Sequence, residues 1–106
     1  MIDEKSILEL CDRIVEEFHP QRIILFGSYA YGKPAEGSDI DILVVLRHVD
    51  SSLRKALEIV RRIKPRVPVD LVVRTPEEVK LRLQANDFFL GEILSRGRVL
   101  YETSDQ

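Results

Sequence analysis

The chain has 106 residues and a mass of 12.2 kDa, with 44% hydrophobic and 32% charged residues. This length suits a single domain spanning residues 1–106 and ending in a polar tail at about 102–106, with no second domain to hold a large acceptor. The formal net charge is −2 and the pI is near 5.7. That balance argues against direct nucleic-acid binding, which is typical of strongly basic domains.

The cysteine content and the hydropathy pattern favour a cytoplasmic protein. Cys11 is the single cysteine, which excludes an internal disulfide and a cysteine zinc site. We expect it to be a small buried side chain. No apolar run reaches the roughly 18 residues of a membrane span, and the acidic start MIDEKS is unlike a secretory leader. We therefore expect no membrane association.

The first half of the chain predicts one helix and two strands. Apolar residues recur with helical spacing from Ser6 to Phe18, and Pro20 ends that helix. The short apolar run from Arg22 to Phe26 predicts a buried strand. Glycine and proline then predict a turn and a loop over residues 27–38, and DIDILVVL, which starts at Asp39, predicts a second strand.

The middle of the chain predicts a further helix and a third strand. Helical spacing runs from Leu53 to Ile63, behind Ser51 or Ser52 as the N-cap. The segment VPVDLVV, residues 67–73, reads as a strand. Because Pro68 lacks an N–H donor, it should lie in the first residues of this strand or on a sheet edge.

The last third predicts helical structure followed by a short strand. The segment TPEE fits a capping box in which Thr75 is the N-cap and Glu78 reaches back to it. That helix, or a successor, should extend through Leu94, with Gly97 as its C-cap before the strand RVLYE. Strands alternating with helices predict an α/β fold, with helices covering at least one face of the sheet.

Two carboxylates on the second strand are the first sign of chemistry. Side chains alternate along a strand, so Asp39 and Asp41 should share a face, roughly 7 Å apart. Neighbouring like charges are unfavourable unless they are exposed or bridged by a cation, and carboxylate oxygens suit Mg²⁺ or Mn²⁺. The alternative interpretation is a solvated strand entrance with no ligand.

Asp70 is a third carboxylate, within an apolar strand. If that strand neighbours the strand of Asp39 in a suitable register, Asp70 joins the pair, and three carboxylates could hold two ions and activate an attacking hydroxyl. The alternative is an ion pair with Arg74 or Arg22.

Gly27 and Ser28 follow the first predicted strand and stand shortly before SDID. Backbone amides and a hydroxyl at such a turn can face an anion, and glycine permits close approach. Ser28 could also simply cap a helical turn. A phosphate cradle here would meet the carboxylates at one edge of the sheet.

These residues together resemble a known motif. The segment LFGSYAYGKPAEGSDIDILVVL is similar to the nucleotidyltransferase motif of the DNA polymerase β-like superfamily, a hydrophobic residue followed by Gly-Gly or Gly-Ser and then Asp-x-Asp on the next strand. It most resembles the minimal nucleotidyltransferase (MNT) family, of the MntA antitoxin type. The resemblance implies a nucleotidyltransferase fold, a mixed β-sheet flanked by helices. It also implies that Gly27 and Ser28 hold the nucleotide triphosphate, and that Asp39, Asp41 and Asp70 are catalytic and bind the metal.

The same resemblance implies a function. Members of this family commonly act as antitoxins beside a HEPN ribonuclease toxin and adenylylate a tyrosine of that toxin, using ATP and Mg²⁺ or Mn²⁺, with two ions expected. This chain departs from the family where it carries Tyr29 and Tyr31, because arginines are frequent at those positions. A cation facing the triphosphate could therefore be missing, with Lys33 as a candidate substitute.

The leading hypothesis is thus a metal-dependent transferase of AMP to a hydroxyl of a HEPN-type toxin partner. The first alternative is a binding module that neutralises the toxin by direct contact, and the second is nucleotidylation of a small molecule. We expect the aromatic residues outside the motif, Phe88 and Phe89, to pack in the core or at its rim. Residues 54–66 are basic, which predicts a solvated face or a surface for a complementary partner.

Overall fold

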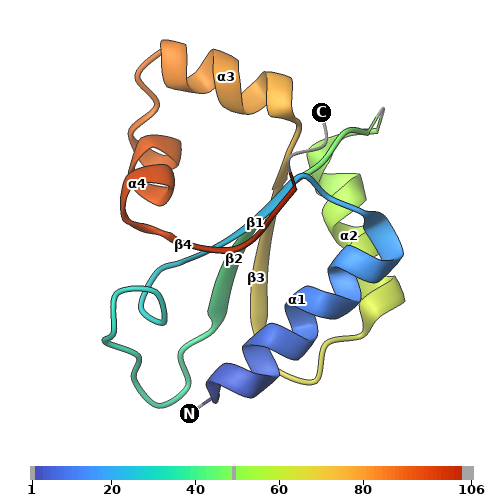
Figure 1. Ribbon diagram of the computed structural model, residues 1–106, viewed down its shortest axis with the longest axis vertical. Coiled ribbons are helices and arrows are strands. Elements are labelled where there is room, and N and C mark those ends of the chain that lie inside the picture. The colour runs from blue at the N-terminus through green and yellow to red at the C-terminus, as the bar shows by residue number, and fades with distance from the viewer. Residues whose placement is uncertain (1, 49, 104–106) are drawn as a thin grey trace.

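Four helices and four strands make up the part of the chain that the computed structural model describes, residues 2–48 and 50–103 (Figure 1). The structure confirms the predicted alternation of helices and strands, and two strands match their expected bounds. The elements in chain order are α1 (Glu4–Phe18), β1 (Arg22–Phe26), β2 (Ile40–Val45), α2 (Ser52–Ile63), β3 (Val69–Arg74), α3 (Pro76–Gln84), α4 (Phe88–Arg96) and β4 (Arg98–Glu102).

The strands form one mixed sheet in the order β3-β2-β1-β4. β1 pairs antiparallel with both β2 and β4, whereas β2 and β3 are parallel. β3 is therefore an edge strand, which is one of the two positions expected for the strand near Pro68. Pro68 lies just before it, and its carbonyl accepts a hydrogen bond of 2.9 Å from the amide of Ile40. The third strand consequently starts later than residue 67, where the apolar run begins.

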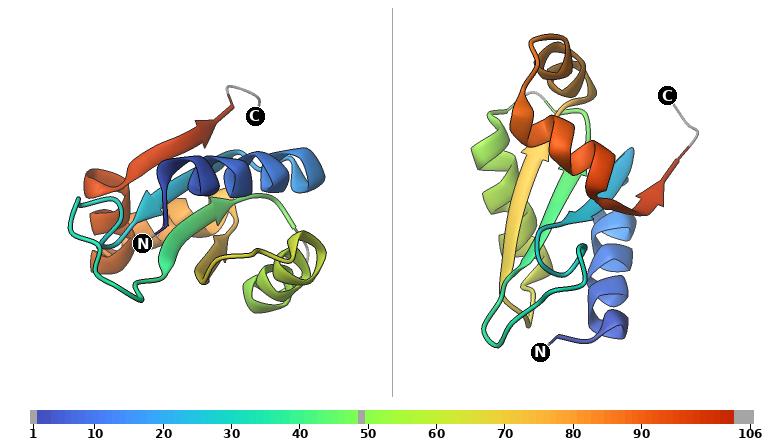
Figure 2. Two further views of the ribbon diagram at one scale, coloured as in Figure 1. Left: turned by 90° about the horizontal axis from the view of Figure 1, so that it is seen from below. Right: turned by 90° about the vertical axis from the view of Figure 1, so that its left-hand side faces the viewer.

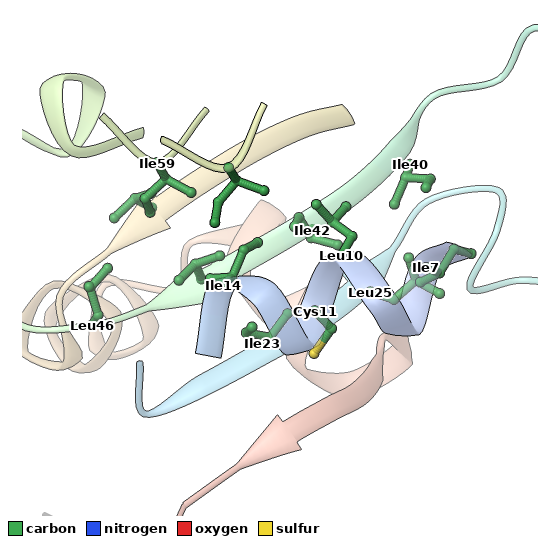
Figure 3. Packing of buried hydrophobic residues seen from close by; sticks show 13 residues of the cluster. Ile7, Leu10, Cys11, Ile14, Ile23, Leu25, Ile40, Ile42, Leu46 and Ile59 are labelled. Carbon is green, nitrogen blue, oxygen red and sulfur yellow. The ribbon is translucent and has the colours of Figure 1, made fainter. Parts of the chain in front are cut away.

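Helices cover both faces of the sheet (Figures 1 and 2). On one face α1 and α2 pack on a cluster that includes Ile23, Leu25, Ile42 and Ile59. Figure 3 shows side chains of α1 directed onto β1 and β2. On the other face α3 and α4 pack on a second cluster through Val79, Leu90 and Ile93, against Ile24, Phe26, Leu43 and Val45. The alternation of strand residues between the two clusters fixes which face each polar residue occupies.

Local capping explains where the helices begin and end. The side chain of Asp3 accepts from the amide of Ser6 at 2.8 Å, so α1 begins two residues before its apolar pattern. The capping box at Thr75 and Glu78 is confirmed by bonds in both directions. A turn with Asn86 at φ 60° separates α3 from α4, so the predicted helical segment is two helices.

The C-terminal strand takes up part of the predicted polar tail. Glu102 ends β4, and the amide of Thr103 donates to the carbonyl of Gln21, so only residues 104–106 of the predicted tail lie outside the described residues.

Phe88 is 80% exposed, so its expected burial is wrong: Leu90 and Ile93 fill the core position of α4 instead. No helix in the described part of the chain is both long and apolar enough to cross a membrane.

Candidate functional site

The parallel pairing of β2 and β3 brings two carboxylates face to face. In this register Asp41 lies directly opposite Asp70, one residue after the pair Ile40 and Val69. Asp39 immediately precedes β2, two residues from Asp41, and is exposed. The register that sequence could not supply therefore joins all three acidic residues at one end of the sheet.

These carboxylates lie on the sheet face covered by α3 and α4. Ile40 and Ile42 pack under α1 and α2, whereas Leu43 packs under α3 and α4. Because side chains alternate along a strand, Asp41 shares the face of Leu43. Phe26, its partner across the antiparallel pair, is on the same face.

Gly27 brings the end of β1 against this acidic group. Its backbone has φ +73°, and a Cβ built on it would collide with the carboxylate of Asp41. Only glycine avoids both the steric collision and the cost of a left-handed backbone. Asp41 therefore lies against the backbone where the turn begins, and the Gly-Ser step and the carboxylates converge as expected.

The turn after Gly27 leaves amides available at its start. The amides of Ala30 and Tyr31 donate to the carbonyl of Gly27 at 3.0 and 3.1 Å, and the amide of Lys33 donates to that of Ser28 at 3.0 Å. Among the described residues no protein group accepts from the amides of Gly27, Ser28 and Tyr29. Free amides at the start of a turn are suited to a phosphate oxygen.

The electrostatics of the site disfavour three negative charges without a counterion. Burial raises the pKa of Asp41, and the neighbouring charges of Asp70 and Asp39 raise it further. A side-chain hydrogen bond with Asp70 also favours the protonated form. A cation beside the carboxylate that contacts Gly27 would therefore stabilise its ionised form.

The donor set fits a divalent cation that shares its ligands with a substrate. Carboxylate oxygens are hard ligands, and Mg²⁺ commonly takes one or two of them and completes its shell with water and phosphate. Within the described residues no three acidic, histidine or cysteine side chains form a group able to hold a metal ion by themselves.

The ion-pair alternative for Asp70 is not what the structure contains. Asp70 is exposed on the edge strand, and no Arg or Lys among the described residues forms a salt bridge with it. Arg74 instead donates to the carbonyl of Val73 at 2.7 Å. An apolar strand suggests a buried carboxylate, but β3 lies at the edge of the sheet and leaves Asp70 in contact with solvent.

The two tyrosines of GSYAYG turn to opposite sides of the sheet. The Tyr29 hydroxyl accepts from the amide of Ile2 at 3.1 Å, and its ring packs against the cluster under α1. The ring of Tyr31 lies under the guanidinium of Arg96, with 4.2 Å between the Arg96 Cζ and the ring centroid. The side chain of Lys33 is exposed. Sequence reasoning missed Arg96, since nothing local connects it with the turn.

The fold and the site together define a nucleotidyltransferase. A mixed sheet ends in opposed carboxylates beside a Gly-Ser turn with free amides. Residues 5–100 match the family model described as "Nucleotidyltransferase domain". The chain belongs to this family, which confirms the resemblance seen in the sequence.

Individual proteins support the same assignment. The chain is 36% identical over 103 residues, 95% of its length and 100% of the other's, to a Methanocaldococcus jannaschii protein named "Putative protein adenylyltransferase MJ0604". A crystal structure described as that of "a putative nucleotidyltransferase from Sulfolobus solfataricus" shares its fold, with a TM-score of 0.64, 22% identity, and coverage of 95% of this chain and 81% of that one. A crystal structure of a toxin-antitoxin with AMP-PNP is similar at a TM-score of 0.54 and 26% identity, over 97% of this chain and 76% of that one.

Proposed function

We propose that the protein transfers AMP from ATP to a hydroxyl, a tyrosine hydroxyl in particular, of a HEPN-type ribonuclease toxin and thereby acts as its antitoxin. The observation that carries this proposal is the register in which Asp41 opposes Asp70 while its carboxylate packs against Gly27. It puts acidic groups and free backbone amides within one site, as transfer from a nucleoside triphosphate requires.

The residues divide the work as follows. Gly27 and Ser28 hold phosphate oxygens of ATP through the free amides and the Ser28 hydroxyl. Asp39 and Asp41, with Asp70, hold Mg²⁺ or Mn²⁺, which when bound neutralises phosphate charge and lowers the barrier to displacement. Asp70 accepts the proton of the acceptor hydroxyl, because it is more exposed to solvent than Asp41, the residue opposite it.

The reaction balances without any further reactant. The acceptor oxygen forms a bond to the α-phosphorus of ATP, and the bond from that phosphorus to the bridging oxygen of the β-phosphate breaks. Pyrophosphate leaves with the electron pair. The proton of the hydroxyl passes to Asp70 and then to solvent.

A protein acceptor agrees with the surface that α3 and α4 present. Large apolar side chains are exposed on α3 and α4, with Leu81 at 65%, Phe88 at 80% and Phe89 at 48% exposure. Exposed apolar patches of this kind mark protein contacts. The adenylyltransferase name of one relative and the toxin-antitoxin with AMP-PNP support the partner and the nucleotide.

The test is label transfer to the toxin with which the protein co-purifies. With Mg²⁺ present, α-labelled ATP should label the toxin and γ-labelled ATP should not, because the β- and γ-phosphates leave as pyrophosphate. Label from γ-labelled ATP would show that the protein transfers the γ-phosphoryl group, which would contradict AMP transfer. Absence of label from both, with toxin neutralised in a stable complex free of ATP, would establish the binding-module alternative instead.

A further inference from the structure

An arginine from the far end of the chain lies on the turn that follows β1. Arg96, the last residue of α4, places its guanidinium over the ring of Tyr31, 4.2 Å from its centroid. Its other partner is Glu92, with 3.6 Å between Arg96 Nη1 and Glu92 Oε2. The Arg96 side chain is 58% exposed, so the stacked cation is oriented yet open to solvent.

Both ends of α4 pack near the end of β1 that lies beside the carboxylates. Phe89 makes an edge contact with Phe26, at 5.7 Å between ring centroids, and Phe26 lies opposite Asp41. Gly97, directly after Arg96, approaches β1 so closely that an added Cβ would lie 2.7 Å from Ile24 Cγ2. The left view of Figure 2 places α4 and the turn after β1 on the same side of the fold.

A nucleoside triphosphate needs positive charge in this corner. The site contributes three carboxylates, and free amides supply only partial charges. The turn that carries the free amides contains Tyr29 and Tyr31, and Lys33 is its one basic residue. Tyr29 is occupied with the core under α1, whereas Tyr31 holds a cation that comes from another element.

Stacking is the right way to present such a cation to a phosphate. A guanidinium that lies flat on an aromatic ring is attracted by the ring face, while its N–H donors at the edge stay free for a bidentate contact. Arg96 also has a partner it can release, since its ion pair with Glu92 is on the surface and weak.

We propose that Arg96, positioned by Tyr31, binds the β- and γ-phosphates of the nucleotide. This inference rests on the proposed function only in that the site takes a nucleoside triphosphate. Transfer to a partner is not required for it. Tyr31 is then a positioning residue, and Lys33 is not needed for the triphosphate.

The experiment compares affinities for ATP and for AMP, measured by calorimetry with Mg²⁺ and without any partner protein. Because AMP lacks the β- and γ-phosphates, Arg96→Ala should weaken ATP by roughly 10- to 100-fold and AMP by less than about 2-fold. Arg96→Lys should restore part of the loss. Tyr31→Phe should retain ATP affinity, since the ring face remains, and Tyr31→Ala should lose part of it.

Two matched variants complete the design. Arg82→Ala removes an exposed arginine of α3 that pairs with Asp87, and it should change neither affinity. Lys33→Ala should likewise leave the ratio of ATP to AMP affinity unchanged. Far-UV circular dichroism and urea midpoints of all variants would reveal a folding defect.

The inference is overturned if Arg96→Ala leaves the ratio of ATP to AMP affinity at the wild-type value, or if Lys33→Ala lowers it instead. Weakening of ATP and AMP by equal factors would also overturn it, because it would indicate a structural role. A wild type that binds ATP but labels no partner refutes the proposed transfer alone. A wild type that binds no ATP refutes both.

Discussion

The carboxylate of Asp41 occupies the space that a side chain at Gly27 would need. The side chain of a β2 residue therefore lies against the backbone at the end of β1, next to the turn that holds the free amides. This contact explains why glycine stands at the end of β1, and it contributes to the burial that raises the pKa of Asp41.

Gly27→Ala should therefore cost both stability and function. The methyl group would displace the Asp41 carboxylate, and φ +73° is unfavourable for alanine. We therefore expect the free energy of unfolding to fall by about 1–3 kcal/mol and nucleotide binding to be lost. Gly91→Ala is the matched control, because its Cβ would meet open space within α4. It should stabilise the protein by about 0.5–1 kcal/mol. Urea unfolding measures both, and equal effects would contradict the account.

Asp41→Asn should stabilise the metal-free protein at neutral pH. The folded-state pKa of Asp41 is raised above its ordinary value of 3.8, so its ionisation opposes folding. That cost is absent below the unfolded-state pKa and complete above the folded-state pKa. The stability difference between variant and wild type should thus grow as pH rises above about 4 and level off above the folded-state pKa. Thermal midpoints in EDTA test this, and a difference that is independent of pH would refute it.

Glu78 should contribute stability that acid removes. Its carboxylate accepts from the amide of Thr75 at 2.8 Å and from the hydroxyl of Ser52 at 3.0 Å, and the Thr75 bond in particular lowers its pKa below 4.5. Glu78→Ala should cost about 1–2 kcal/mol at pH 7. This contribution is complete above the unfolded-state pKa and is lost as pH falls through the folded-state pKa, so the gap between variant and wild type should close once the pH lies below the folded-state pKa.

The neighbouring carboxylate provides the control for Glu78. Glu77 is exposed, and its contact with Arg47 is 3.9 Å long. Glu77→Ala should change stability by less than about 0.5 kcal/mol in urea unfolding at either pH. A loss at Glu77 as large as that at Glu78 would mean that general charge effects, rather than the capping box, decide the result.

The single cysteine should be inert in the folded protein. Cys11 is 4% exposed in the core under α1, and burial raises the pKa of its thiol to about 11. At pH 8 only about one thiol in a thousand is then ionised. A thiol reagent should react within seconds in urea and only at the rate of unfolding in buffer. Rapid reaction of the folded protein would contradict this burial.

Local signals predicted most of the fold. The β-branched run of residues 22–26 and the capping box at Thr75 each specify their element without distant contacts, and the structure confirms both. The errors also have local causes. Periodicity cannot register the Asp3 cap that lengthens α1, and an apolar run does not indicate that β3 is an edge strand, where Asp70 is solvated.

The site was predictable only in part because its parts meet through tertiary structure. Spacing placed Asp39 beside Asp41, but the opposition of Asp41 and Asp70 depends on how two strands separated by α2 align. The contact of Arg96 with Tyr31 depends on the path of α4 across the sheet. No periodicity or motif encodes such pairings.

The most direct test of the central claim is transfer of label from α-labelled ATP to the toxin by three forms of the protein. The wild type should label the toxin with Mg²⁺ and lose the signal in EDTA, and Asp39→Asn with Asp41→Asn should abolish it while the fold remains. Asp12→Asn, which removes an exposed carboxylate of α1, should label normally. Full labelling by the double variant, or labelling that persists in EDTA, would contradict a metal-dependent site built on these carboxylates.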